Sequence, residues 1–227
     1  MDQPSLQFHR DYEETVRLKD GTKVTLRLIR PSDKQLLLEG FERLSPQSRY
    51  ARFLAPKLKL TDADLRYLTE VDGVDHFAIA AVLASRFGKQ EGVGVGRFVR
   101  SKDRTDTAEP AITVADDQQG KGLGTILLHR LADAAWERGI RQFSCEVLAE
   151  NTRIRDLLPE IGSDVVIQHI DAGTAVVTFP VDPPAPDERW HPGVAVRRML
   201  SYFARELVSF IPRSTRPPEE PHQNPVD

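Results

Sequence analysis

A glycine-rich stretch between a strand pattern and a helix pattern has the residue types and spacing most suggestive of chemistry. It reads Asp116-Asp117-Gln118-Gln119-Gly120-Lys121-Gly122-Leu123-Gly124, between the apolar run 111–115 and a helical pattern that extends to Arg138. A turn at the start of a helix directs unpaired backbone N–H groups at one anion, and glycine lets a phosphate approach without a Cβ in the way. We therefore predict that this turn holds a phosphorylated ligand.

Known phosphate-binding patterns narrow the choice of ligand. The dinucleotide fingerprint needs glycine at its sixth position, which is Thr125 or Leu127 here, and the P-loop needs Ser or Thr where Gly122 follows Lys121. The pattern that fits is Gln-x-x-Gly-x-Gly, from Gln119 to Gly124. This pattern resembles the acyl-CoA pyrophosphate turn of the GNAT superfamily of N-acetyltransferases. A glycine-rich turn without a ligand is the alternative.

Composition excludes several classes of protein. The chain has 227 residues, 40% of them hydrophobic and 29% charged, which fits one globular domain with appendages. Its net charge of −3 argues against nucleic acid as a partner. The only cysteine is Cys145, so no disulfide can form within the chain, and we expect a cytoplasmic location without a secretory signal or membrane span. The six histidines lack metal-ligand spacing, and we expect no metal site.

The surrounding elements follow from hydrophobic periodicity and turn residues. A β-hairpin is predicted across Lys19-Asp20-Gly21, and helices are predicted to begin at the capping pairs Ser32/Gln35 and Thr61/Asp64. Further strands are predicted over 77–83, 93–99, 109–115 and 143–148, a long helix over 122–138, and a second hairpin over 165–170 and 174–181.

Composition also indicates where the domain ends. Ten of the sixteen prolines lie in 180–227, and the first residues carry no clear pattern. We expect a disordered start over 1–11, a domain over 12–181, a proline-rich linker over 182–192, an amphipathic helix over 193–211 and a disordered tail over 212–227. The amphipathic helix is expected to dock on its own domain or on a second copy, which would make a homodimer. Contact with another partner or with a membrane surface is the alternative.

The order of elements over roughly 12–181 resembles the GNAT fold, and it is most similar to Pat-type protein lysine acetyltransferases. Three segments carry the likeness: 24–33 with 41–50, Ala108-Glu109, and 119–124 with 146–151. The resemblance implies an α/β (α+β) fold with a mixed, mostly antiparallel central sheet flanked by helices, here with a C-terminal helical extension.

The resemblance also implies acetyl-CoA as co-substrate. The backbone N–H groups of the turn would hold its pyrophosphate, with the Thr125 side chain as a further contact; the turn residues are Gln119, Gly120, Lys121, Gly122, Leu123 and Gly124. The pantetheine would lie along Ile112, Thr113 and Val114, and an N–H near Ile112 would polarise the thioester carbonyl. Asn151 matches a family asparagine that contacts the pantetheine arm; a helix N-cap is its alternative role.

Glu109 is similar in placement to the family's catalytic glutamate, ten residues before Gln119. A lysine amine titrates near ~10.4, so a base must remove its proton before it attacks. A solvated carboxylate at a strand start is the alternative role for Glu109. The tyrosine that serves many family members as general acid is replaced by Leu158, so the thiolate leaves unassisted or another residue serves. We expect structural roles for His76 and Cys145.

Three functions are compatible with these residues. The first is transfer of an acetyl group from acetyl-CoA to a primary amine, with a protein lysine as the expected acceptor. The second is acetylation of small-molecule amines. The third is a non-catalytic acyl-CoA sensor whose C-terminal helix engages a partner.

Overall fold

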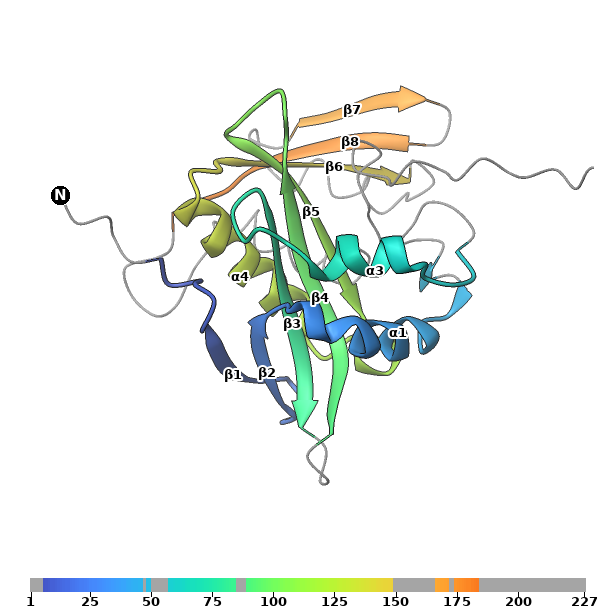
Figure 1. The fold of residues 1–227 in the computed structure, drawn as a ribbon. Helices are drawn as coiled ribbons and strands as arrows, with labels where there is room; N and C mark the ends of the chain where they lie inside the picture. Colours follow the sequence, from blue (N-terminus) through green and yellow to red (C-terminus); the bar gives the residue numbers. More distant parts are fainter. Residues whose placement is uncertain are drawn as a thin grey trace, which may run out of the picture.

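The computed structural model describes residues 6–46, 48–49, 57–84, 89–148, 166–171 and 174–183. Eight strands form one sheet in the order β1-β2-β3-β4-β5-β6-β8-β7 (Figure 1). They are β1 Glu13–Arg17, β2 Lys23–Leu28, β3 His76–Ala84, β4 Gln90–Arg100, β5 Thr107–Val114, β6 Gln142–Leu148, β7 Val166–Asp171 and β8 Thr174–Pro180. Among these described strands, neighbours run antiparallel except β5 and β6, which run parallel. The expected mixed, mostly antiparallel sheet is confirmed.

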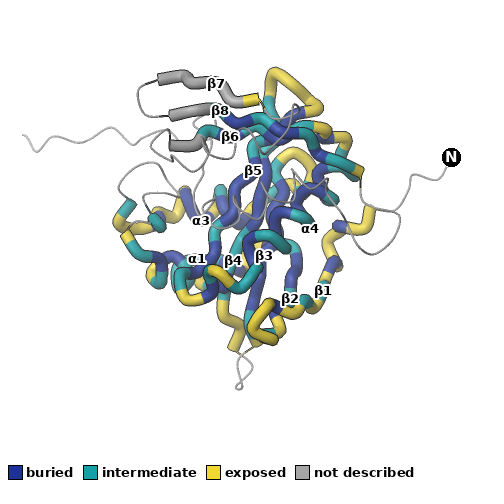
Figure 2. The backbone as a smooth tube through the Cα atoms, turned by 180° about the vertical axis from the view of Figure 1, so that it is seen from behind, coloured by how far each residue is buried: buried dark blue, intermediate teal, exposed yellow. Residues whose placement is uncertain are grey.

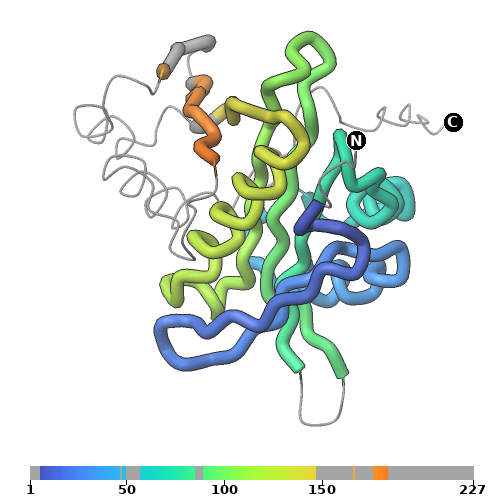
Figure 3. Tube along the Cα trace, turned by 90° about the vertical axis from the view of Figure 1, so that its left-hand side faces the viewer, coloured from blue at the N-terminus to red at the C-terminus, as the bar shows by residue number. Residues whose placement is uncertain are grey.

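Helices cover both faces of this sheet. The helices α1 Lys34–Glu42 and α3 Asp62–Thr69 lie on one face, and α4 Leu123–Glu137 lies on the other (Figure 3). The helix α4 sits close to β4 because β4 presents glycines there: a Cβ on Gly94 would lie 3.1 Å from Leu127 Cδ1. The chain thereby places the turn before α4 at the end of β5, beside the sheet.

Helices begin near both predicted starts, but only one of the two predicted capping pairs is confirmed. The backbone N–H of Asp64 donates to Thr61 Oγ1 at 3.1 Å, and Thr61 N donates to the Asp64 carboxylate at 2.7 Å, as the capping pair predicts. The pair Ser32/Gln35 does not form a cap. A 3₁₀ turn over Pro31–Asp33 precedes α1, and Asp33 accepts the N–H of Arg30 at 2.7 Å instead. Asp33 takes this place because it is also held by Arg27.

Four phenylalanines tie the two halves of the sheet together. Phe77 stacks on Phe98 with ring centroids 5.2 Å apart, Phe98 lies 6.3 Å from Phe143, and Phe143 lies 5.8 Å from Phe179. All four are buried, in the core that extends over the middle strands and α4 (Figure 2). Because β5 and β6 share few ladder positions, this aromatic row is a main link between β1–β5 and the strands beyond.

The expectation of a disordered start does not hold for residues 6–11. The side chain of Phe8 is fully buried, and the N–H groups of Gln7 and Phe8 donate to the Glu137 carboxylate at 2.9 and 3.2 Å. An aromatic residue in a short polar stretch was enough to dock it, because burying a phenyl ring contributes about 1.5–3 kcal/mol. In the described part of the chain no helix is long and apolar enough to cross a membrane. The predicted linker beyond 183, the helix over 193–211 and the tail lie outside the described residues.

Candidate functional site

The glycine-rich turn joins β5 to α4 as the sequence predicts. A 3₁₀ turn over Asp116–Gln118 follows β5, and the backbone takes positive φ at Gly120 (+74°) and Gly122 (+91°) before α4 begins. These two angles are accessible to glycine at little energetic cost. The side-chain nitrogen Nε2 of Gln119 donates to Val114 O at 3.2 Å and to Asp116 Oδ1 at 3.0 Å. These hydrogen bonds fix the turn against the end of β5.

The backbone N–H groups of this turn are available to a ligand. Within the described residues, the N–H groups of Gly120 through Thr125 have no hydrogen-bond partner; the first helical bond of α4 runs from Ile126 N to Gly122 O at 3.1 Å. The first N–H groups of a helix lack intrahelical partners by geometry, and the helix dipole adds a positive potential there. The turn can therefore bind an anion such as a pyrophosphate.

We expect Gly122→Ala to weaken coenzyme A binding by about tenfold or more, the equivalent of one lost hydrogen bond to a charged group. The new Cβ would stand among the N–H donors, 3.4 Å from the Lys19 side chain. Gly139→Ala is the matched control, because Gly139 also has a positive φ (+77°), with open space around it, at the far end of α4. Both variants should lose about 1–2 kcal/mol of stability to backbone strain. Calorimetry should show the loss of affinity in Gly122→Ala alone; equal affinities would contradict an anion site at the turn.

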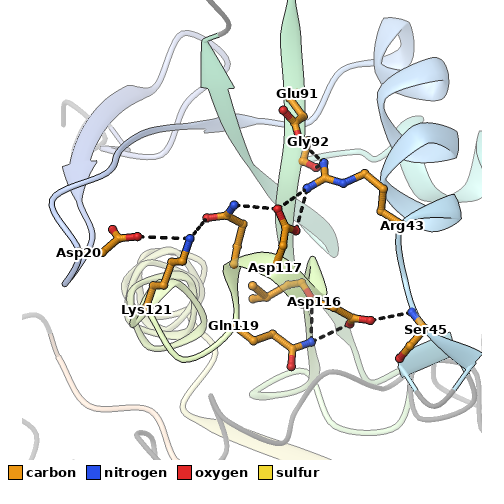
Figure 4. Close-up of polar contacts among 11 residues, drawn as sticks. Asp20, Arg43, Ser45, Glu91, Gly92, Asp116, Asp117, Gln119 and Lys121 are labelled. Atoms are coloured by element: carbon orange, nitrogen blue, oxygen red, sulfur yellow. Dashed lines mark hydrogen bonds and ion pairs between the residues drawn. The ribbon is translucent and has the colours of Figure 1, made fainter.

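Side chains join the turn to α1 and to the loop that follows α1 (Figure 4). The Asp117 carboxylate accepts two hydrogen bonds from Arg43 at 2.8 and 3.0 Å, and Arg43 also pairs with Glu91 on β4. The Asp116 carboxylate accepts the Ser45 N–H at 2.7 Å and the Ser48 hydroxyl at 2.6 Å. These two carboxylates therefore fix the position of the glycine-rich turn relative to the end of α1 and the loop that follows it.

Both carboxylates stay ionised at neutral pH. Burial alone would raise the pKa of Asp116, but hydrogen bonds from Ser48 and Ser45 outweigh it and hold the pKa below its usual value. Burial also opposes ionisation of Asp117, and hydrogen bonds from Gln118 and Arg43 lower its pKa. On the other side of the turn, the Lys121 ammonium pairs with Asp20 at 3.2 Å and donates to Gln118 Oε1 at 3.0 Å.

The strands β5 and β6 separate after a short contact. Their recorded pairs are Thr107–Gln142 and Ala108–Phe143, and the described residues beyond these positions share no ladder. Ala115 N donates to Val93 O on β4, so by strand alternation the polar groups of Thr113 face β4, and those of Ile112 and Val114 face the gap toward β6. Among the described residues, the edge of β5 that faces β6 at Ile112 and Val114 pairs with no strand, and it lies directly beside the glycine-rich turn.

Glu109 lies where the gap opens. It follows Ala108, the last β5 residue paired with β6, and it is half-buried opposite Val99 of β4. By alternation its side chain lies on the sheet face of Thr113, the face that α1 and α3 cover. Burial raises the pKa of the Cys145 thiol on β6, and the charge of Glu109 raises it further.

A pocket lies between this sheet face and the helices α1 and α3. Its volume is about 690 Å³, counting the open mouth. Most of its lining is apolar, and its polar side chains are Thr113 and Arg97; the other lining residues are Ile29, Leu36, Leu37, Gly40, Phe41, Leu44, Leu60, Leu68, Ala80, Gly92, Val93, Gly94, Val95 and Ala115. The pocket and the gap lie on either side of β5.

The two residues for which we expected structural roles are placed as follows. His76 Nε2 lies 3.1 Å from Arg97 Nη1, and because a guanidinium can only donate, Nε2 accepts and the proton resides on Nδ1. Cys145 is 2% exposed, and burial raises the pKa of its thiol, so it is not a nucleophile. Asn151 and Leu158 lie outside the described residues.

Sequence reasoning missed the contacts of Arg97, of Arg43 and of the neighbouring carboxylates Asp116 and Asp117. A signal for Arg97 was present: it is the one charged residue within the strand pattern Val93-Gly94-Val95-Gly96-Arg97-Phe98-Val99. A charge at a strand position that must be buried requires a partner or a function. No comparable signal existed for Arg43, because its partners lie far away in the sequence.

Comparisons with known proteins agree with this geometry. Residues 23–163 match the family model described as an acetyltransferase (GNAT) domain. The GNAT domain of PAT from S. lividans is 31% identical with a TM-score of 0.64, and the match covers 74% of this chain and 96% of that domain.

Two curated relatives carry the name acetyltransferase. Acetyltransferase Pat of Mycolicibacterium smegmatis is 32% identical over 187 residues, which is 76% of this chain and 53% of the relative. The chain thus spans about half the length of that relative. An acetyltransferase of Pseudomonas aeruginosa is 34% identical over 145 residues, covering 64% of this chain and 77% of the relative.

Proposed function

The chain belongs to the GNAT family of acetyltransferases, and from that membership we propose that it moves an acetyl group from acetyl-CoA to a primary amine, with protein lysine as the acceptor class. One observation carries the proposal. The N–H groups of residues 120–125, which have no partner among the described residues, lie directly beside the β6-facing edge of β5, which pairs with no described strand beyond Ala108. A pyrophosphate and an amide-bearing arm are the two parts of acetyl-CoA, the co-substrate of this family, that such a pair of features suits.

The donor would bind in two parts. Its pyrophosphate accepts hydrogen bonds from the turn N–H groups, and its pantetheine amides pair with the gap-facing groups of Ile112 and Val114. Thr113 contributes its side chain to the pocket instead, because its backbone belongs to the β4 ladder. The Ile112 N–H is then the donor placed to stabilise negative charge on the thioester oxygen.

Glu109 is the proposed general base. It takes the proton from the substrate ammonium, the amine nitrogen attacks the thioester carbonyl carbon, and the C–S bond breaks to release coenzyme A as a thiolate that takes up a proton. Its position supports this role, because it stands at the mouth of the gap on the face that an acceptor would approach. The transfer is direct, and Cys145 takes no part in it.

The acceptor class is tested by mass spectrometry. Purified protein is incubated with acetyl-CoA and either a set of folded proteins or a panel of small amines. We expect acetyl-lysine on proteins, with rates at least tenfold above the uncatalysed reaction. Acetylation of small amines alone would replace the proposed acceptor by the small-molecule class. Binding of acetyl-CoA without turnover of any acceptor would identify a sensor.

A further inference from the structure

Arg97 is a buried cation on the floor of the pocket. It is 3% exposed and comes from β4, beneath α3. Its Nη1 contacts His76 Nε2 at 3.1 Å, and its Nη2 donates to Leu68 O at 3.1 Å in the last turn of α3. Its Nε is buried and has no hydrogen-bond partner. Both of its partners are neutral acceptors.

No carboxylate neutralises Arg97 within the described residues: it takes part in none of their ion pairs. Burial lowers the pKa of its guanidinium to about 10, and the nearby Tyr67 opposes this shift. A buried charge without a partner is costly, and proteins ordinarily avoid it. The contact with Leu68 O at the end of α3 uses only one edge of the guanidinium.

Arg27, a second buried arginine on this sheet face, has the carboxylate partner that Arg97 lacks among the described residues. Arg27 on β2 is also 3% exposed, and Asp33 accepts two hydrogen bonds from it at 2.8 Å each. The part of the chain that the structure describes therefore supplies a carboxylate to Arg27 and none to Arg97. The difference coincides with the pocket, which Arg97 lines and Arg27 does not.

A second unpaired donor lies close by. The Tyr67 hydroxyl is buried without a hydrogen-bond partner, and the Tyr67 ring packs against His76 with centroids 4.7 Å apart. The Tyr67 hydroxyl is near enough to Arg97 to affect its pKa. A cation and a hydroxyl beside an otherwise apolar pocket are suited to one carboxylate at the end of a short apolar chain.

We propose that this pocket is the acceptor subsite and that Arg97 recognises a carboxylate on the acceptor, so that preferred substrates are amines with a carboxylate a few atoms away. For a protein lysine, the carboxylate comes from an acidic neighbour. The proposed preference among acceptors depends on the proposed acetyl transfer. The proposed binding of a carboxylate at Arg97 does not depend on it.

The acceptor, rather than the acyl chain, is the source of the carboxylate. The acyl donor lies along the gap on the β6 side of β5, whereas Arg97 lies on β4, on the other side of β5. Glu109 and the pocket share one sheet face, so an amine that meets Glu109 can place its remaining atoms in the pocket.

The test uses matched acceptors that differ in one carboxylate: 5-aminopentanoate against pentylamine, and a lysine peptide with a neighbouring Glu against the same peptide with Gln. We expect wild-type kcat/KM to favour the carboxylate by about 10- to 100-fold in at least one pair. This ratio should fall toward one in Arg97→Gln and stay unchanged in Arg66→Gln, which removes the same charge from the exposed side of α3. Ratios near one in the wild type, or a ratio kept in Arg97→Gln, would overturn the proposal.

Two further measurements keep the proposal testable if Arg97→Gln does not fold or no acceptor turns over. Arg97→Lys keeps the charge but loses the planar fork, and its ratio should fall below the wild-type value; an unchanged ratio would count against recognition by Arg97.

Glutarate, titrated into the protein with coenzyme A bound, should bind the wild type at least tenfold more tightly than either Arg97 variant. Equal glutarate binding in all variants overturns the carboxylate site, whatever the activity. Succinyl-CoA preferred over acetyl-CoA through Arg97 would overturn the assignment to the acceptor.

Discussion

Replacing Glu109 with Gln lowers kcat/KM for acetyl transfer by about 10²–10⁴-fold, the usual contribution of a positioned general base. The amide keeps the size of the side chain and one acceptor oxygen but cannot take a proton. The variant then depends on amine that is already neutral, so its rate should keep rising with pH toward the lysine pKa of ~10.4, whereas the wild type levels off earlier. Initial rates of coenzyme A release across pH measure both effects.

Glu146→Gln is the matched control for this prediction. Glu146 is a half-buried carboxylate on β6, on the opposite side of the gap and, by alternation, on the same sheet face as Glu109. We expect its replacement to leave the pH dependence unchanged. If the large loss and the altered pH profile occur in Glu146→Gln instead, the base has been assigned to the wrong strand. Acetyl-CoA affinity should be similar in both variants, because neither residue belongs to the glycine-rich turn.

Replacing Asp33 with Ala destabilises the fold by about 3–5 kcal/mol, because it leaves Arg27 buried without its counter-charge. The two groups are 4% and 7% exposed at their side chains and share two hydrogen bonds of 2.8 Å. Asp33 also accepts a hydrogen bond from the Arg30 N–H, so the substitution leaves this backbone group before α1 without its acceptor as well. Urea denaturation followed by circular dichroism gives the free energy of unfolding.

Glu70→Ala is the corresponding control at the surface. Glu70 pairs with Lys34 at 2.6 Å, a shorter contact than the buried one, but both side chains are about half exposed. Solvent-exposed pairs contribute about 0–1 kcal/mol, so we expect almost no change. A similar loss in both variants would show that removal of any ion pair near α1, rather than burial of an unpaired charge, explains the result.

The local patterns of the sequence predicted much of this fold. The first hairpin, the cap at Thr61, the strand-turn-helix around Gly122 and the strands from β3 to β6 occupy the expected places, because each depends on residues within one turn or one strand. The cap at Ser32 was wrong because Asp33 has a partner on β2 that no local pattern reveals. The docking of Phe8 escaped prediction for the same reason.

The candidate site could be predicted only in part. The glycine-rich turn follows from glycine spacing, whereas Glu109 was proposed because its placement resembles that of the catalytic glutamate in Pat-type enzymes. The opening between β5 and β6 could not be derived, because strand pairing depends on contacts between segments 30 or more residues apart. The same limit applies to the pairing of Arg43 with Asp117. It also applies to Arg97, which has no carboxylate partner among the described residues, since an unpaired charge becomes visible only once its neighbours are placed.

The burial of the chain's single cysteine has a practical consequence at the bench. A protein whose only sulfhydryl is enclosed by β6, β8 and the core does not react with thiol dyes while it stays folded. With an acceptor that lacks cysteine, the colour that such a dye develops during turnover then comes from the released coenzyme A. A continuous spectrophotometric readout is therefore possible without blocking or mutating the enzyme, and a slow background signal would report unfolding.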